Sequence, residues 1–274
     1  MGAESPENGS ARLSPPPLHG FGVADRASRL EPMSTVIAAI RSIVTYVVVA
    51  LYVLLMGPPF LLIALIVGSP RLLYSVGLWG VRLGLFLSGV RMERHGLEHL
   101  QHDRAAVYAV NHASNVEPCL IFDVLHELFP RLRILYKAEL RKLPILVRAF
   151  DLAGFVPLER GNRDQSLPAI ERAADALRAG NSFLIFPEGT RSRTGELLPF
   201  KKGGFIMALK AQAPIVPVAI KGARNAMRKG SLIIYPVTVQ VRLGAPIETA
   251  GLGIEQRDEL VARVRGEVAR MLEA

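Results

Sequence analysis

An apolar stretch near the N-terminus is the feature that most constrains this chain. No charged side chain occurs from Ser42 to Pro70, between Arg41 and Arg71. An uninterrupted apolar run of about 18 or more residues is typical of a membrane segment, and this one is too long for a signal-peptide core. Gly57-Pro58-Pro59 interrupts the run, and consecutive prolines remove helical hydrogen bonds. We therefore expect two short helices that enter and leave one leaflet, with a single kinked span as the alternative.

Different segments flank this run. Residues 1–32 are rich in Ser, Pro and Gly, so we expect a disordered tail, or an untranslated stretch if Met33 is the true start. Leu72–Val90 carries one charge and predicts a helix at the membrane surface or the domain boundary, with an ordinary buried helix as the alternative. The chain thus divides into a tail, a membrane-associated helical segment over residues 33–90 and a globular domain over residues 91–274.

The net charge is +9, from 33 Lys and Arg against 24 Asp and Glu. Such a charge favours a polyanionic partner such as nucleic acid, an anionic membrane or a phosphorylated substrate. Most of the excess positive charge is spread over the region after residue 90. Because no expected helix concentrates Lys and Arg, we expect no nucleic-acid partner. A single cysteine excludes a disulfide framework and a multi-thiolate metal site.

After residue 90, short β-rich runs alternate with helical segments. This pattern predicts an α/β fold with a mixed, mostly parallel sheet flanked by helices. The expected strands are Ala105–Val110, Arg133–Tyr136, Phe155–Leu158, Phe183–Phe186, Ile215–Ile220 and Val237–Leu243. The expected helices are Val116–Phe129, Leu140–Ala153, Gln165–Arg178, Phe205–Ala211 and Gln256–Leu272. The last helix has one apolar face at helical spacing, made of Leu260, Val264, Val268 and Met271.

Several kinds of site lack support in the sequence. It has no P-loop, no complete dinucleotide-binding loop and no Gly-x-Ser-x-Gly elbow. His95, His99 and His102 have helical spacing, but acidic and polar neighbours favour a solvated surface segment over a metal site. Cys119 stands in an apolar context and is expected to be a buried structural thiol. We expect no metal site.

His112 has a different setting. It follows the expected strand Ala105–Val110 and precedes a helix, and sites gather at the carboxyl ends of strands in α/β sheets. Asn115 is a suitable N-cap, which would put Glu117 in the first turn of that helix. Glu117 would then either only complement the helix dipole or fold back to His112 and fix the tautomer of its imidazole. The spacing alone leaves both roles open.

A second motif, Phe186-Pro187-Glu188-Gly189-Thr190-Arg191-Ser192, follows a strongly apolar strand. Gly189 lets the backbone approach a ligand closely, and Arg191 can donate two hydrogen bonds to a phosphate. Positive charge in the same loop is increased by Arg193, Lys201 and Lys202. The motif therefore indicates a phosphate-binding loop.

Together these motifs resemble those of the glycerolipid acyltransferase family, and within it the bacterial 1-acylglycerol-3-phosphate acyltransferases, over residues 40–250. The resemblance rests on four blocks in the family's order: Asn111-His112 to Glu117, Gly154–Arg160, Phe186–Ser192 and Ala213–Val218. The first block departs from the family's His-x4-Asp pattern. Glu117 is one methylene longer than the usual Asp, so the turn must adjust for it to reach His112.

The resemblance implies transfer of a fatty acyl chain from a thioester to the sn-2 hydroxyl of lysophosphatidic acid, which makes phosphatidic acid in phospholipid biosynthesis. In that reaction His112 would deprotonate the hydroxyl and Glu117 would orient His112. The implied substrate-binding residues are Lys137, Arg160, Glu188, Gly189, Thr190 and Arg191. Lys137 has a surface lysine as its alternative role, and Glu188 would either anchor the loop or bind the glycerol.

The resemblance also implies partners and a location. The donor would be acyl-CoA or acyl-carrier protein, and no cofactor is required. An amphiphilic acceptor implies the cytoplasmic face of the cell membrane, and Arg41, Arg71 and Arg82 beside the apolar segments agree with it. Acylation of glycerol 3-phosphate at sn-1, or of another lysolipid, is the nearest alternative. The alternatives from other classes are a membrane-bound lipid hydrolase and a nonenzymatic lipid-binding protein.

Overall fold

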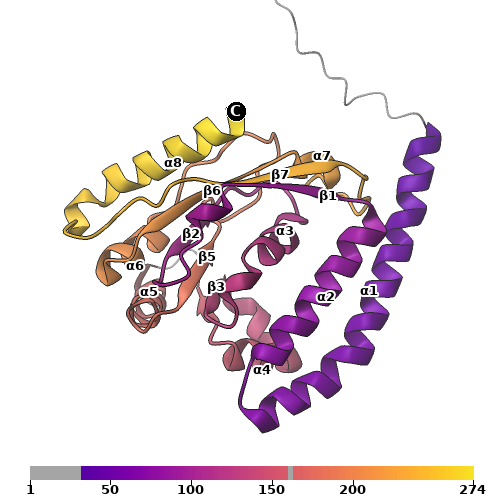
Figure 1. The fold of residues 1–274 in the computed structure, drawn as a ribbon, viewed down its shortest axis with the longest axis horizontal. Helices are drawn as coiled ribbons and strands as arrows, with labels where there is room; N and C mark the ends of the chain where they lie inside the picture. The colour runs from indigo at the N-terminus through magenta and orange to yellow at the C-terminus, as the bar shows by residue number, and fades with distance from the viewer. Residues whose placement is uncertain (1–31, 160–162) are drawn as a thin grey trace, which may run out of the picture.

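The computed structural model describes residues 32–159 and 163–274. Two apolar helices lead into a sheet that is covered by helices on both faces (Figure 1). The helices are α1 (Pro32–Val67), α2 (Arg71–Ser88), α3 (Glu117–Val124), α4 (Pro144–Leu152), α5 (Arg163–Arg178), α6 (Gly203–Ala211), α7 (Ala223–Ala226) and α8 (Arg257–Glu273). The strands are β1 (Arg91–His95), β2 (Val107–Val110), β3 (Leu132–Lys137), β4 (Val156–Leu158), β5 (Ser182–Ile185), β6 (Ile215–Lys221) and β7 (Thr238–Leu243).

The sheet is mixed and mostly parallel. Its strand order is β1-β7-β6-β2-β5-β3-β4, and only the β6–β7 pair is antiparallel. The predicted α/β class is therefore confirmed. The central strands β2 and β5 are buried along their whole length, as continuous apolar runs in a parallel sheet require.

The expected strands are confirmed to within two residues at each end, and β1 is an additional strand that the sequence did not predict. It lies at the edge of the sheet, pairs with β7, and is mostly exposed and charged. The expected helix Val116–Phe129 is shorter, because α3 ends at Val124 and a 3-10 turn follows at His126–Leu128. The expected helix Leu140–Ala153 is also shorter. A 3-10 turn at Ala138–Lys142 precedes α4, which begins at Pro144.

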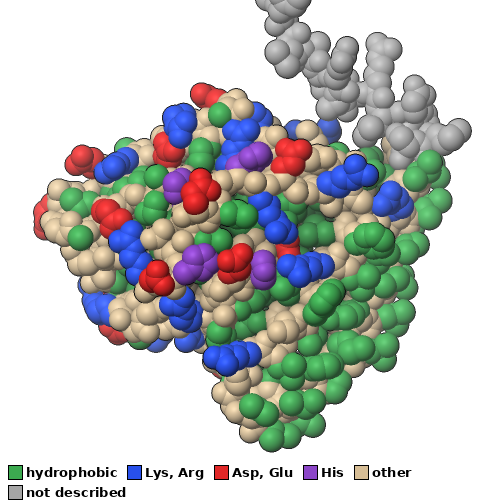
Figure 2. Space-filling model, viewed as in Figure 1, with side chains coloured by type: hydrophobic (Ala, Val, Ile, Leu, Met, Phe, Trp, Pro, Cys, Tyr) green, Lys and Arg blue, Asp and Glu red, His purple; other side chains and the backbone are tan. Residues whose placement is uncertain are grey.

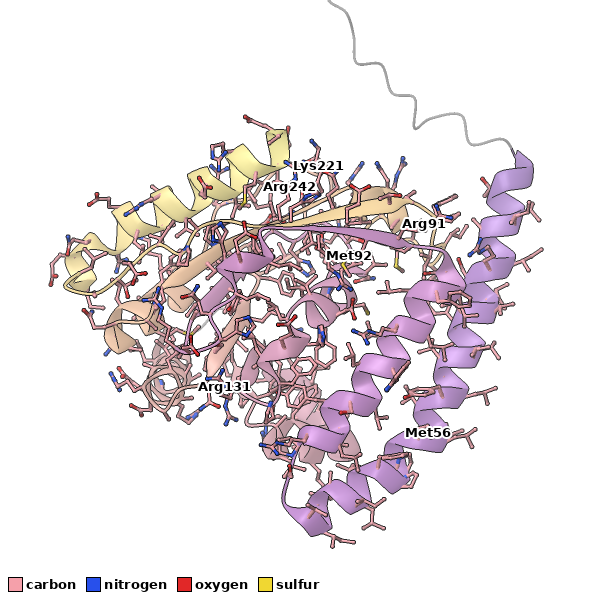
Figure 3. The ribbon with its side chains drawn as sticks, in the orientation of Figure 1. Met56, Arg91, Met92, Arg131, Lys221 and Arg242 are labelled. Atoms are coloured by element: carbon pink, nitrogen blue, oxygen red, sulfur yellow. The ribbon has the colours of Figure 1, made fainter. Side chains whose placement is uncertain are left out.

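Two apolar cores lie on opposite faces of the sheet. One packs α3 and α7 against the sheet, and Met92 of β1 joins it from the edge (Figure 3). The other packs α5, α6 and α8 against the opposite face. The predicted apolar face of α8 is confirmed, because Leu260, Val264, Val268 and Met271 are all buried in this second core.

The predicted break at Gly57-Pro58-Pro59 is wrong. Helix α1 continues through both prolines, and the chain reverses at residues 68–70 instead. The prolines remove two hydrogen bonds to carbonyls one turn earlier, which bends a helix without ending it when packing holds both halves. Figure 3 shows such a bend near Met56. The hairpin is therefore formed by α1 and α2 rather than by two halves of the run from Ser42 to Pro70.

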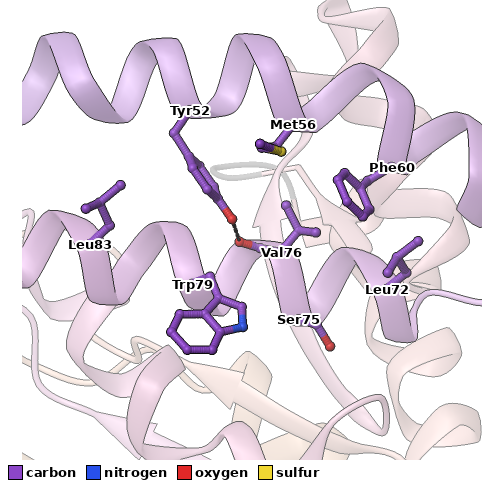
Figure 4. Close-up of a pocket in the computed structure, with 8 residues that line it drawn as sticks. All are labelled: Tyr52, Met56, Phe60, Leu72, Ser75, Val76, Trp79 and Leu83. Carbon is purple, nitrogen blue, oxygen red and sulfur yellow. Dashed lines mark hydrogen bonds between the residues drawn. The ribbon is translucent and has the colours of Figure 1, made fainter.

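Helices α1 and α2 pack as an antiparallel pair. The Tyr52 hydroxyl donates to the carbonyl of Val76 at 2.8 Å (Figure 4). The Arg41 guanidinium on α1 donates to the carbonyl of Leu87. Gly80 permits this approach, because a Cβ there would lie 2.8 Å from the Tyr52 ring. Between the helices lies an apolar groove of about 550 Å³, lined by Tyr52, Met56, Phe60, Leu72, Ser75, Val76, Trp79 and Leu83.

The outward face of α1 is apolar and exposed. Thr35–Val67 has a mean hydropathy of 2.4 in its most apolar window, of which only 11% is buried. On α2, Trp79 is 66% and Phe86 is 79% exposed. Figure 2 shows hydrophobic side chains crowded over these two helices, while charged side chains cover the sheet domain. A core helix of a soluble domain would be buried, so this exposed surface indicates membrane association.

Candidate active site

The site lies where two neighbouring parallel strands end. Strands β2 and β5 pair in register, with Ala109 opposite Ile185. His112 follows β2 and Glu188 follows β5, so the two sequence motifs meet at one edge of the sheet. The backbone N–H of Ser192 donates to the carbonyl of His112 at 2.7 Å, which joins the motifs directly.

His112 and Glu117 form a hydrogen-bonded pair. Oε2 of Glu117 lies 2.8 Å from Nδ1 of His112, and both carboxylate oxygens accept the N–H of Ala113 at 3.0 and 2.8 Å. The Glu117 side chain is fully buried, whereas that of His112 is 18% exposed. The imidazole also packs on the Phe186 ring, with ring centroids 4.3 Å apart. Of the two arrangements that the sequence left open, the structure therefore has the one in which Glu117 folds back to His112.

The start of α3 explains how Glu117 reaches His112. The predicted cap at Asn115 is wrong, because Val116 occupies the N-cap position and Asn115 is exposed. Glu117 is the first helical residue, so its side chain points back toward the end of β2 rather than along the helix. The preceding turn is held by Ser114, whose hydroxyl donates to the carbonyl of Met227 at 2.7 Å.

Helix α3 is also tied to its surroundings at its far end. Asp123 is buried and forms ion pairs with Arg82 of α2 and Arg94 of β1. The first of these joins Nε of Arg82 to Oδ1 of Asp123 at 2.7 Å. The helix that carries Glu117 is thereby fixed both to the membrane-associated hairpin and to the edge of the sheet.

Glu188 is a buried anchor between the two motifs. Its Oε1 accepts the N–H of His112 at 2.5 Å, and its Oε2 accepts the N–H of Leu198 at 2.9 Å. Burial raises the pKa of this carboxyl, and the nearby Glu117 adds to the rise, while the two backbone donors and His112 oppose it. Because both oxygens are engaged by backbone, these contacts favour the anchoring role over glycerol binding.

Gly189 and Arg191 shape the loop after β5. Gly189 has a φ of +68°, and its N–H donates to the carbonyl of Phe186, which closes a turn. This positive φ favours glycine, and a Cβ there would also require the Lys201 side chain, 2.8–3.0 Å away, to move. Nη1 of Arg191 is buried and has no hydrogen-bond partner among the described residues. A buried guanidinium donor without a partner is costly and is expected where a ligand supplies the acceptor.

Two predicted residues are not placed with this group. Lys137 ends β3 on the same edge of the sheet, but its ammonium pairs with Glu139 at 2.9 Å and its side chain is 52% exposed. Arg160 lies outside the described residues, so its role stays a prediction. Thr190 is exposed beside Arg191, where it accepts a hydrogen bond from Lys229 at 3.3 Å.

Sequence reasoning missed residues that hold the site in shape. The Asn111 side chain exchanges two hydrogen bonds with the backbone of Ile220, at 2.7 and 3.1 Å, and so ties the first motif to β6. Asn111 stands next to His112, which is the only hint of this role in the sequence. Lys229 is also missed, since nothing in the chain around it forms a motif.

This arrangement can perform base catalysis on a phosphorylated alcohol. With Nδ1 of His112 held by a buried carboxylate, Nε2 is the nitrogen that can take a proton. The loop from Gly189 to Ser192 provides a cationic donor beside it. Among the described residues, no group of three His, Cys, Asp or Glu side chains gathers to hold a metal ion.

Comparison with known proteins identifies the family. The sequence pattern named Acyltransferase matches residues 91–221. The chain is 31% identical over 220 residues to a 1-acyl-sn-glycerol-3-phosphate acyltransferase of Limnanthes douglasii, covering 78% of this chain and 76% of that protein. A protein of the same name from Borreliella burgdorferi is 27% identical over 193 residues, which cover 70% of this chain and 76% of that protein.

A solved structure has the same fold. The crystal structure of the 1-acyl-sn-glycerophosphate acyltransferase of Thermotoga maritima matches with a TM-score of 0.73 and 24% identity, over 87% of this chain and 97% of that one. The relatives and the matched pattern confirm the resemblance carried by the four sequence blocks. The chain therefore belongs to the acyltransferase family that includes the 1-acyl-sn-glycerol-3-phosphate acyltransferases.

Proposed function

We propose that this protein transfers a fatty acyl chain from an acyl thioester to the sn-2 hydroxyl of lysophosphatidic acid and so makes phosphatidic acid. One observation carries the proposal: the His112–Glu117 pair is joined by the Ser192–His112 hydrogen bond to a loop with a buried, unpartnered Arg191 donor. A base and a phosphate-binding group side by side match an acceptor that has both a hydroxyl and a phosphate. The names of the relatives support this acceptor.

The reaction is a direct transfer. Nε2 of His112 takes the proton of the acceptor hydroxyl as its oxygen attacks the thioester carbonyl carbon. The tetrahedral intermediate collapses, the carbon–sulfur bond breaks, and the imidazolium returns the proton to the departing thiolate. The buried carboxylate of Glu117 stabilises the imidazolium while it exists. No acyl-enzyme is needed, because the alcohol itself is the nucleophile.

The phosphate of the acceptor is the ligand for the second motif. Arg191 donates to it, and the turn around Gly189 lets it approach the backbone. Thr190, Lys137 and Arg160 complete the proposed binding set, and Glu188 keeps the loop in register with His112. The acyl donor is acyl-CoA or acyl-carrier protein, and both present the same thioester.

The hairpin of α1 and α2 brings the site to its amphiphilic substrate. Arg41 lies where α1 approaches the end of α2, while Arg71 lies at the opposite end of the hairpin. Charged residues at both ends fit a hairpin that lies on one face of the bilayer, with the exposed surface of α1 in the acyl chains. We place that face on the cytoplasmic side. Tags fused at the two chain termini should both be accessible from the cytoplasm only.

An acceptor panel tests the function. Purified protein in mixed micelles is given a labelled acyl thioester with lysophosphatidic acid, glycerol 3-phosphate or another lysolipid, and with no acceptor. We expect labelled phosphatidic acid as the main product. Preferential acylation of glycerol 3-phosphate or another lysolipid would replace the proposed acceptor. Release of free fatty acid without any acceptor would instead indicate a hydrolase.

A further inference from the structure

Lys229 is a cation beside the proposed phosphate site that no sequence motif includes. Its ammonium donates to the carbonyl of Arg191 at 2.8 Å and to the Thr190 hydroxyl at 3.3 Å. The side chain is partly buried, and no described carboxylate forms an ion pair with it. Its positive charge is therefore held next to Arg191, whose buried Nη1 lacks a hydrogen-bond partner among the described residues.

The segment that carries Lys229 is fixed at both ends. On one side, the carbonyl of Met227 accepts the hydroxyl of Ser114, in the turn between His112 and Glu117. On the other, the N–H of Ile234 donates to the buried Ser42 hydroxyl of α1 at 2.8 Å. The segment 227–234 thus connects α1 to both motifs. Because its ends are anchored, Lys229 is held in place before any substrate binds.

The charge of the substrate calls for a second cation. A phosphate monoester carries about −1.5 to −2 charges at pH 7, since its second pKa is about 6. Arg191 supplies one positive charge. Arg160, which is also in the proposed binding set, lies outside the described residues. The charge of Lys137 is shared with Glu139, and that of Lys202 with Asp258. Lys201 lies against Gly189, whereas Lys229 binds the Arg191 carbonyl. Lys229, unpaired within the described part of the chain, is the cation in contact with Arg191 and Thr190.

We propose that Lys229 binds the acceptor phosphate together with Arg191 and favours a dianionic phosphate monoester over less charged headgroups. This inference rests on the proposed function. A different role for Lys229 would be purely structural, as a clamp that holds the backbone of Thr190 and Arg191 in place. The two roles differ in one respect. If Lys229 binds the phosphate, its loss raises the acceptor KM more when the phosphate carries more negative charge.

The test compares Lys229→Met with the wild-type protein, using lysophosphatidic acid in mixed micelles. Loss of one charge-assisted contact should raise the KM for this acceptor about tenfold at about pH 7.5, with kcat and the KM for the acyl donor little changed. At about pH 5.5, where the acceptor has lost much of its second charge, the ratio of the two KM values should fall to a few-fold. Lys229→Arg should stay close to the wild type.

Lys210→Met is the matched control. It removes the same charge, but Lys210 pairs with Glu171 on the surface of α5 and α6. We expect its acceptor KM to equal that of the wild type. Thermal unfolding of all variants shows whether the fold is kept.

Each result has one meaning. An acceptor KM that is unchanged in Lys229→Met, or raised equally at both pH values, would overturn the inference while leaving the proposed function intact. A wild-type protein that does not acylate lysophosphatidic acid would instead overturn the proposed function. A variant that fails to fold is replaced by Lys229→Gln, which keeps a hydrogen-bond donor for the Arg191 carbonyl, and the same criteria apply.

Discussion

The Glu117 carboxylate lies 2.8 Å from Nδ1 of His112 and accepts the N–H of Ala113 as well. The resemblance predicts the shorter Asp at this position, yet the longer Glu makes the contact here. It does so because α3 begins at Glu117 itself and the side chain folds back over the turn. The pair is therefore built into the start of the helix rather than formed across it.

Glu117→Gln should lower kcat by about 10²–10⁴-fold with little change in KM. The Gln carbonyl would be drawn to the N–H of Ala113, which turns the amide NH₂ toward Nδ1. Nδ1 would then accept a hydrogen bond, which favours the tautomer with the proton on Nε2. A protonated Nε2 cannot take the proton of the acceptor hydroxyl. Glu117→Asp should remain active, because it keeps a carboxylate, in the form of the residue that the resemblance predicts at this position. Steady-state kinetics check both variants. An unchanged kcat in Glu117→Gln would show that Glu117 only complements the helix dipole and does not orient His112.

Arg191→Met should raise the KM for the phosphate-bearing acceptor by roughly 10- to 100-fold, since a charge-assisted hydrogen bond is lost. The KM for the acyl donor should stay the same. Arg270→Met is the matched control, because Arg270 pairs with Glu267 on the exposed surface of α8. Equal effects of the two variants on acceptor KM would place the phosphate elsewhere.

Glu188→Gln should destabilise the protein by about 1–3 kcal/mol, because an amide has one acceptor oxygen where two backbone donors need one each. The N–H of His112 or of Leu198 would then be left buried without a partner. Glu248→Gln breaks an exposed pair with Arg104 and should change stability by less than about 1 kcal/mol. Chemical denaturation compares them, and equal stabilities would contradict the anchoring role.

Leu54→Asp with Leu55→Asp should shift the protein from the membrane fraction toward the soluble fraction. Both side chains are more than 60% exposed, so the change affects the outward face of α1 and not its contact with α2. Leu167→Asp, at an exposed position on α5, is the matched control and should leave the distribution unchanged. Flotation with vesicles measures this. If both aspartates left the protein in the membrane fraction, the α1 surface would not be the anchor.

The strands could be predicted from sequence because their causes are local, whereas the role of Glu117 beside His112 was only implied by the resemblance. Buried parallel strands appear as continuous apolar runs. The spacing from His112 to Glu117 allowed either a contact or a helix-dipole role, and the structure contains the contact. Strand β1 was missed because an exposed edge strand needs no apolar pattern. The break at Pro58-Pro59 was wrongly predicted because the sequence does not reveal that α2 packs along α1 and supports a bent helix.

Long-range contacts account for the rest of what the sequence did not predict. Lys229 contacts Arg191, which lies 38 residues earlier in the sequence. Ser42 contacts Ile234, which lies 192 residues later. Such pairs arise from how the segment between α7 and β7 packs against α1 and the loop after β5. No spacing rule within a single sequence indicates them.

The most direct test of the account is the rate of acyl transfer to lysophosphatidic acid by His112→Asn. The Asn amide nitrogen takes about the place of Nδ1 and can still donate to Glu117, so the fold is kept while the base at Nε2 is lost. We predict that transfer falls by about 10²–10⁴-fold, with His112→Ala equally inactive and with unchanged thermal unfolding. Near-normal transfer by a folded His112→Asn protein would contradict the assignment of His112 as the base.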